Sequence, residues 1–200
     1  MTAVKLRRAL SEVYADESLE AMARVLAEAA ERGWIAYGEV DLDEPDRLDL
    51  MLLLIEERLL IPKASAKSMA WEDRLARFTS DEVYEMPHAV RNLIKMALEE
   101  GVWRPREAVE RYLNEIGEAK TGAILMLLDR LVGLVEDHRV DADALRGAAE
   151  ELGLGRDINR IIAELKGSGV LSPSLRDPRR LEYEFNSALL RGWPSSTLDA

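Results

Sequence analysis

The chain contains no cysteine and only two histidines among its 200 residues. The absence of cysteine excludes disulfide bonds, thiolate nucleophiles and cysteine-ligated zinc. His88 and His138 have no partners at a spacing that would complete a metal site or a set of nucleophile, base and orienting group. We therefore predict that the protein is not an enzyme and has no catalytic residues, no cofactor and no metal ligands.

The chain also has no long apolar run. Its densest apolar block covers residues 50–61, and Glu56, Glu57 and Arg58 interrupt it. A helix that crosses a bilayer needs about 20 apolar residues. The basic start of the chain is not followed by the apolar stretch of a secretory signal. We therefore expect a soluble, cytoplasmic protein that does not bind a membrane.

Positive charge is scarce and unevenly distributed. The 27 Lys and Arg residues face 38 Asp and Glu residues, so the net charge is −11. Because phosphate contacts demand a positive surface, this balance argues against general binding of polyanions. Residues 155–180 are an exception, since they hold six basic and three acidic side chains.

Most of the chain shows helical periodicity. Between Pro45 and Pro62, the apolar stripe of one predicted helix consists of Leu48, Met51, Leu52 and Ile55. The other helices of the first 137 residues are predicted over 18–32, with Ser18 as N-cap and Gly33 as its end, and over 88–100, 105–117 and 120–137. Strands are predicted at 34–40 and 83–86, and an irregular loop or hairpin at 63–81. A helix is the alternative for 83–86, because Thr79 and Glu82 have the spacing of a capping box.

The C-terminal quarter has the clearest order of elements. A strand candidate at 139–141 precedes a helix with an apolar stripe from Ala142 to Leu152, and Gly153 and Gly155 then form a turn. A second stripe consists of Ile158, Ile161, Ile162 and Leu165, and two strands follow at Val170–Leu171 and Leu181–Phe185. This order resembles the winged helix-turn-helix superfamily, although no particular family within it is identified. In members that bind DNA, the second helix of the turn enters the major groove and the wing touches the backbone.

A faint internal repeat relates the two halves of the chain. A shift of 111 residues places Leu50, Met51 and Leu54 on Ile161, Ile162 and Leu165, and places Leu60–Pro62 on Leu171–Pro173. Tyr84–Met86 then matches Tyr183–Phe185 if the first copy carries an insertion of 12 residues. The match rests on about eight positions, so coincidence is the alternative interpretation.

Together, the resemblance and the repeat predict a mainly α fold with small β-wings. Tandem winged-helix-like modules would be joined by a central helical segment. The predicted domains are an N-terminal winged-helix-like domain at 1–100, a helical connector at 101–120 and a C-terminal winged-helix domain at 121–200.

One face of the second helix of the turn is polar. Arg156, Asn159, Arg160 and Ala163 stand at i, i+3, i+4 and i+7, so they face away from the core. Arg and Asn suit the edges of guanine and adenine, and a small residue lets a helix sit deep in the groove. The resemblance places further arginines on the wing, where they would reach phosphates. The candidate nucleic-acid-binding residues are Arg156, Asn159, Arg160, Arg176, Arg179 and Arg180. The alternative is an ordinary solvated helix face, because Asp157 and Glu164 would also point toward phosphates.

The corresponding helix of the first half is strongly acidic. Over residues 43–58, six Asp and Glu side chains face two arginines. A helix with this charge is repelled by a phosphate backbone. If the first half is a winged helix, we therefore expect it to serve a protein partner or self-association.

These features lead to two expected functions. The first is a DNA-binding, transcription-regulator-like protein, which would need to be a homodimer for useful affinity because one module makes few phosphate contacts. The alternative is a protein–protein adaptor in a multisubunit or chromosome-organising assembly, without direct DNA binding. Among the aromatic residues, we expect Trp34 in the core and either Trp71 or Trp193 as an exposed anchor for a partner.

Overall fold

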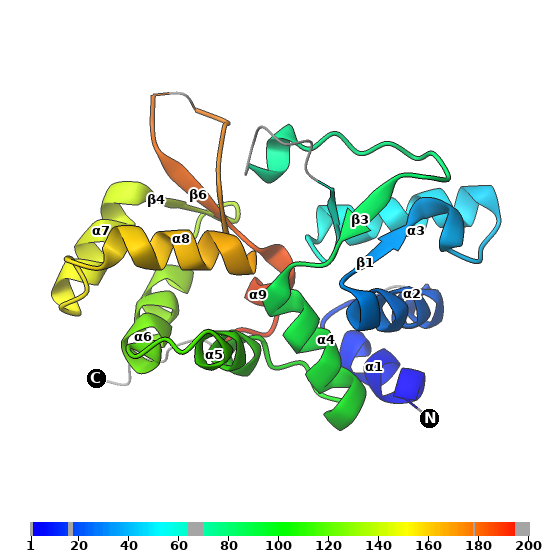
Figure 1. The fold of residues 1–200 in the computed structure, drawn as a ribbon, viewed down its shortest axis with the longest axis horizontal. Coiled ribbons are helices and arrows are strands. Elements are labelled where there is room, and N and C mark those ends of the chain that lie inside the picture. Colours follow the sequence, from blue (N-terminus) through cyan, green and yellow to red (C-terminus); the bar gives the residue numbers. More distant parts are fainter. Residues whose placement is uncertain (1, 16–17, 64–69, 178, 195–200) are drawn as a thin grey trace.

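The structure is a computed structural model that describes residues 2–15, 18–63, 70–177 and 179–194. Two halves lie side by side along the longest axis of the molecule, with the N-terminal half on the right in Figure 1. In its described part, each half combines helices with a small three-stranded antiparallel sheet. The prediction of a mainly helical protein with short strands is therefore confirmed.

The N-terminal half begins with a helix that the sequence pattern did not reveal. This helix buries Leu6, Ala9 and Leu10. The second helix has the predicted bounds, because Gly33 adopts φ 84° and donates its N–H to the carbonyl of Ala29. The elements of this half are α1 (Thr2–Ser11), α2 (Leu19–Arg32), β1 (Trp34–Ala36), η1 (Tyr37–Glu39), α3 (Glu44–Glu56), β2 (Ile61–Pro62), η2 (Trp71–Asp73) and β3 (Val83–Glu85).

Helix α3 differs from its prediction in length and in its buried face. It ends at Glu56 instead of Pro62. Leu50, Met51 and Leu54 are buried, whereas Leu52 is exposed. The predicted stripe was right for Met51, which is buried, and for Ile55, which packs against the core, but wrong for Leu52. Residues 50–55 are apolar on every side of the helix, so spacing alone does not choose the buried side.

The C-terminal half contains the remaining elements. Its third helix ends at Val132 instead of residue 137, and the chain then turns through Asp137 and His138, which both have positive φ. The elements are α4 (His88–Glu100), α5 (Pro105–Glu115), α6 (Thr121–Val132), β4 (Arg139–Asp141), α7 (Ala142–Glu151), α8 (Ile158–Ser168), β5 (Leu171–Pro173), β6 (Glu182–Phe185) and α9 (Ser187–Leu190).

The two sheets have the same topology. Their strand orders are β1-β3-β2 and β4-β6-β5, so in each the last strand lies in the middle. The registers also agree, because Pro62 lies opposite Tyr84 and Pro173 lies opposite Tyr183. These are positions that the sequence repeat pairs. In the first half, the predicted strand at 34–40 ends at Ala36 and the chain continues as the short helix η1.

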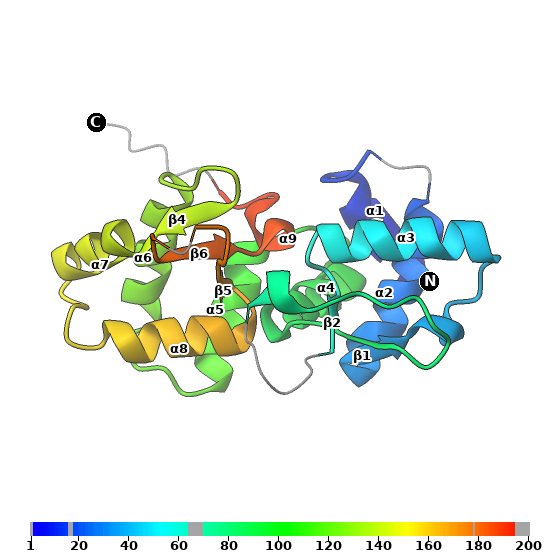
Figure 2. The ribbon, with the colours of Figure 1, turned by 90° about the horizontal axis from the view of Figure 1, so that it is seen from above.

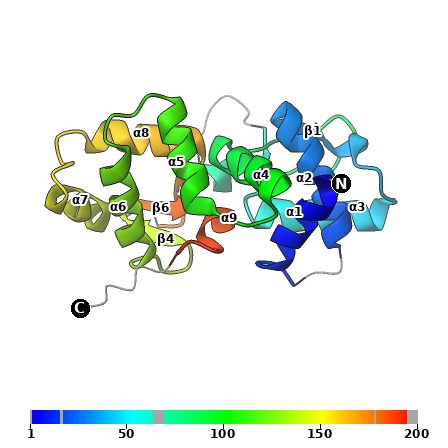
Figure 3. The ribbon, with the colours of Figure 1, turned by 90° about the horizontal axis from the view of Figure 1, so that it is seen from below.

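One hydrophobic core runs through both halves. Helices α1, α4, α5 and α6 form a layer on the underside of the molecule, and the sheets lie on the other side of this layer (Figures 1 and 3). Helix α4 packs against α1, α2 and α5 and also touches α8. Helix α8 and strand β1 lie along the same side of the molecule, the lower edge of Figure 2.

Polar contacts also join the halves. Arg58 Nε donates to Glu184 Oε1 at 2.7 Å. The N–H of Trp71 donates to Ser172 Oγ at 3.0 Å. A third link runs from the N–H of Ala188 to the carbonyl of Glu57, also at 3.0 Å. The surfaces that the two halves present are therefore held in a fixed relation.

Candidate functional site

The outer face of α8 is exposed as predicted. Its apolar residues face the core, whereas Asn159, Arg160 and Ala163 face solvent. This division follows from the helical spacing of the two sets. The helix begins at Ile158 and not at residue 155, so Arg156 is exposed in the turn before α8 and does not share the helical face of the other three. The structure therefore leaves the predicted recognition face sterically accessible.

Carboxylates neutralise the central cation of this face. Arg160 donates to Glu118, in the turn between α5 and α6, and to Glu164 Oε1 at 2.6 Å. The side chain of Glu118 is only 3% exposed. The hydrogen bond from Arg160 holds the pKa of Glu118 below its usual value. Arg160 would have to leave these partners before it could bind a phosphate.

The rest of the α8 face carries little net charge. Lys120 Nζ lies 2.6 Å from Asp157 Oδ2, at the start of the helix. Asn159 Oδ1 accepts a long hydrogen bond of 3.4 Å from Arg146. Arg156 is exposed and forms no ion pair with any residue that the structure describes. Of the predicted contacts Arg156, Asn159 and Arg160, only Arg156 is thus a cation without an ion pair among the described residues.

The loop between β5 and β6, which was predicted to be the wing, likewise contains both paired and unpaired arginines. Arg176 Nη1 lies 2.5 Å from Asp137 Oδ2. Arg179 and Arg180 are exposed, and neither is ion-paired within the described part of the chain. The six predicted residues therefore supply three available arginines, not one continuous cationic surface.

The predicted roles of the tryptophans are reversed. Trp34 is the most exposed of the three at 37%, whereas Trp71 and Trp193 are 5% and 6% exposed. Trp34 lies outward because its neighbour Ile35 takes the core side of the sheet. Trp193 is buried against Phe185, and its Nε1 donates to Asp129 at 3.1 Å.

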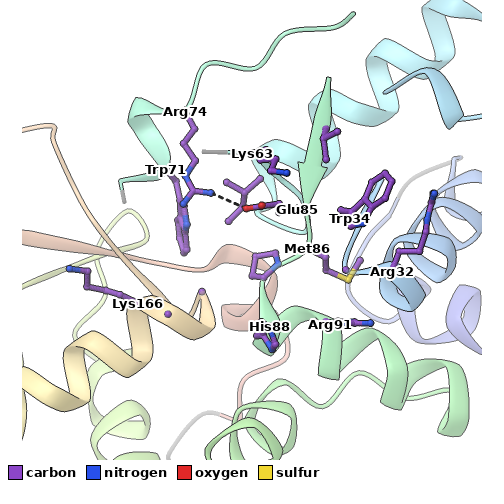
Figure 4. A pocket seen from close by; sticks show the side chains of 16 residues that line it. Arg32, Trp34, Lys63, Trp71, Arg74, Glu85, Met86, His88, Arg91 and Lys166 are labelled. Atoms are coloured by element: carbon purple, nitrogen blue, oxygen red, sulfur yellow. Dashed lines mark ion pairs between the residues drawn. The ribbon is translucent and has the colours of Figure 1, made fainter. Parts of the chain in front are cut away.

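A basic pocket that sequence reasoning missed lies between the halves. Its volume is about 610 Å³, and it is bounded by the outer face of the first sheet, the start of α4 and the end of α8. Glu85 lies near its centre, with Trp71 and Trp34 on opposite sides in Figure 4. Its charged residues are Glu85 and the five cations Arg32, Lys63, Arg74, Arg91 and Lys166. Sequence patterns did not reveal it, because these residues come from five separate segments of the chain.

Among the described residues, no group of three or more His, Cys, Asp or Glu side chains is arranged to hold a metal ion. Within the same part of the chain, no helix combines the length and the apolar character that crossing a membrane requires.

Comparison with known proteins places the chain in a family. A family model matches residues 5–189, so the chain belongs to this family, whose function is unknown. No curated protein and no solved structure matches the chain significantly.

Proposed function

We propose that this is a recognition protein of two winged-helix units whose C-terminal unit contacts duplex DNA. The order helix, strand, helix, helix, strand, strand runs from α6 to β6, and the last strand lies between the other two. The N-terminal half repeats this order from α2 to β3, with η1 as a shortened second helix. In this arrangement the third helix and the wing are the parts that meet DNA.

The observation that carries the proposal is the uncovered outer face of α8. Arg156 in the turn before it, and Arg179 and Arg180 in the proposed wing, are exposed cations without ion pairs in the described part of the chain. Three phosphate contacts give weak binding that declines steeply with salt, with a slope of about −0.9 per contact in a log–log plot. A dimer that presents two such units would be needed for useful affinity.

Fluorescence anisotropy with a mixed-sequence duplex tests the proposal. Wild type should bind at low salt and lose affinity steeply as salt rises. The variant Arg156→Glu/Arg179→Glu/Arg180→Glu should not bind. The matched control, Arg7→Glu/Arg8→Glu/Arg24→Glu, changes the same number of charges at exposed arginines of the N-terminal half. It should bind the duplex more tightly than the first variant does. A wild type that does not bind at low salt would overturn the DNA proposal, and light scattering would report the dimer.

The acidic face of α3 favours the adaptor function as a second candidate. Asp43, Asp46 and Asp49 are exposed there. The nearby charge of Asp43 raises the pKa of Asp46, which reflects repulsion between the two carboxylates. A basic segment of a protein partner would relieve this repulsion, whereas DNA would increase it. The absence of DNA binding, together with a strictly monomeric state, would favour this candidate.

A further inference from the structure

The basic pocket concentrates positive charge in an acidic protein. Five lysines and arginines line it against a single carboxylate, that of Glu85, whereas the whole chain carries a net charge of −11. Cations at this density repel one another unless something compensates them. Some of this charge is compensated by contacts within the fold.

Two of the cations have clear structural roles. Arg91 donates from Nε to the carbonyl of Ala30 at 2.7 Å and from Nη2 to the carbonyl of Glu31, so it caps the end of α2. Arg32 forms a two-pronged ion pair with Glu39, with both bonds at 2.9 Å. The fold accounts for these two side chains without any ligand.

The other three cations are poorly compensated. Lys63 and Lys166 form no ion pair with any described residue. Arg74 lies 3.8 Å from Glu85, which is long for an ion pair. The Nε of Arg74 is buried and has no hydrogen-bond partner in the described structure. Buried donors without partners are rare in native proteins, and an unoccupied ligand site is one physical explanation.

One wall of the pocket suits a flat ring. Trp34 is 37% exposed, and the guanidinium of Arg32 lies 4.5 Å from the centroid of its ring. Trp71 lines the other side but is only 5% exposed, and Glu85 lies between the two indoles (Figure 4). Aromatic faces stack on planar groups regardless of ring identity.

We infer that this pocket binds a small ligand that combines a phosphate or diphosphate group with a planar ring, as a nucleotide does. Lys63 and Arg74 would hold the phosphate oxygens. The ammonium of Lys166 is turned away from Glu85 in Figure 4, and its flexible stem would let it swing toward the ligand. Trp34 would stack on the ring. A volume of about 610 Å³ falls in the range of small-ligand sites, and it is too small to admit a DNA duplex. The inference is independent of DNA binding by α8.

Calorimetric titration with three probes tests the inference: adenosine diphosphate, pyrophosphate and adenosine. The first two should bind and raise the melting temperature, since a ligand that binds only the folded state stabilises it. Adenosine should bind at least tenfold more weakly than adenosine diphosphate. If neither phosphate-bearing probe binds, the inference is overturned.

Charge variants locate the site. Lys63→Glu/Lys166→Glu should lower the affinity for adenosine diphosphate at least tenfold, whereas Glu85→Gln, which removes the one carboxylate, should raise it. Lys63→Glu alone should already lower the affinity by more than twofold. Its matched control, Lys95→Glu on α4, lies outside the pocket and should leave the affinity within twofold. An equal loss in Lys95→Glu would mean nonspecific attraction and would overturn the inference.

The aromatic wall has its own readout. Trp34→Leu should weaken adenosine diphosphate more than pyrophosphate, because only the former has a ring to stack. Equal losses for both probes would contradict the ring contact. If the duplex, but not adenosine diphosphate, loses affinity in Lys63→Glu/Lys166→Glu, the pocket belongs to the DNA surface and the small-ligand inference is overturned.

Discussion

Arg58 in the N-terminal half and Glu184 in the C-terminal half form an ion pair at the joint between them, with Nε 2.7 Å from Oε1. Their side chains are 19% and 9% exposed. The guanidinium of Arg58 also lies 5.7 Å from the ring centroid of Trp71. One arginine thus connects β6, the insertion at η2 and the turn after α3.

Removal of Arg58 should destabilise the whole protein. We expect Arg58→Ala to lower the free energy of unfolding by about 3 kcal/mol, because it leaves the carboxylate of Glu184 buried and unpaired. Urea unfolding followed by circular dichroism measures this. Arg24→Ala, at an exposed position of α2, is the control and should change stability by less than about 0.5 kcal/mol. Equal effects in the two variants would contradict a structural role for the pair.

A close approach of the halves at Gly169 makes a second prediction. A Cβ on Gly169 would lie 2.4 Å from the Cβ of Pro87, and the φ of Gly169 is +76°. Gly153 has a similar φ of +69°, but its Cβ would meet nothing within 4 Å. Both alanine variants should lose about 1 kcal/mol from the left-handed backbone, and Gly169→Ala should lose at least about 1 kcal/mol more from overpacking. If thermal unfolding shows an equal loss of stability in the two variants, the contact between Gly169 and Pro87 relaxes to accept the added methyl group.

Local signals in the sequence were sufficient for several elements. The apolar spacing before Gly33 set the bounds of α2, and the repeat anticipated that Tyr84 and Tyr183 would occupy equivalent strand positions. Such signals work because the cap, the stripe and the strand lie within a few residues of one another. Helix α1 was missed, and its short stripe gives a much weaker signal than the longer helices do.

The candidate site depended on contacts that local signals do not carry. Arg160 and Glu118 are 42 residues apart in the sequence. The spacing within α8 therefore indicated only one carboxylate near Arg160, that of Glu164. The burial of Trp193 likewise results from packing on Phe185 and a hydrogen bond to Asp129. Tertiary partners thus decided which predicted cations remain free, and they also assembled the basic pocket.

Glu72 accepts hydrogen bonds from Ser174 and Leu175 in the loop after β5, and these bonds predict that the stability of the fold depends on pH. Burial raises the pKa of Glu72, but hydrogen bonds from the N–H of Leu175, from Arg139 and from Ser174 outweigh it, so the folded pKa lies below 4.5. The stabilisation is therefore complete above pH 4.5 and is lost as the pH falls through the folded pKa. Glu72→Gln should be less stable than wild type at pH 7, and this difference should shrink in acid.

Melting temperatures at several values between pH 7 and pH 3 test this behaviour. Glu99→Gln, which changes an exposed carboxylate on α4, is the control and should follow wild type throughout. A difference between Glu72→Gln and wild type that stays constant with pH would show that the carboxylate charge of Glu72 does not stabilise the fold.

The pairing of Arg160 gives the sharpest test of how α8 would meet DNA. If the proposal is right, Glu118→Gln/Glu164→Gln releases Arg160 and should strengthen duplex binding by roughly fivefold, since the ion pairs of an arginine that is itself 45% exposed hold it by about 1 kcal/mol. The salt dependence should steepen by about 0.9, the value of one more phosphate contact. Anisotropy titrations at several salt concentrations measure both quantities.

The matched control removes two carboxylates elsewhere. Glu107 pairs with Arg104 and Glu115 pairs with Arg111, all near or on α5. Glu107→Gln/Glu115→Gln changes the net charge by the same amount, so any general gain from reduced acidity appears in both double variants. A gain confined to Glu118→Gln/Glu164→Gln identifies Arg160 as a contact. Equal gains would mean that net charge alone sets the affinity, and the outer face of α8 would then not be the DNA-binding surface.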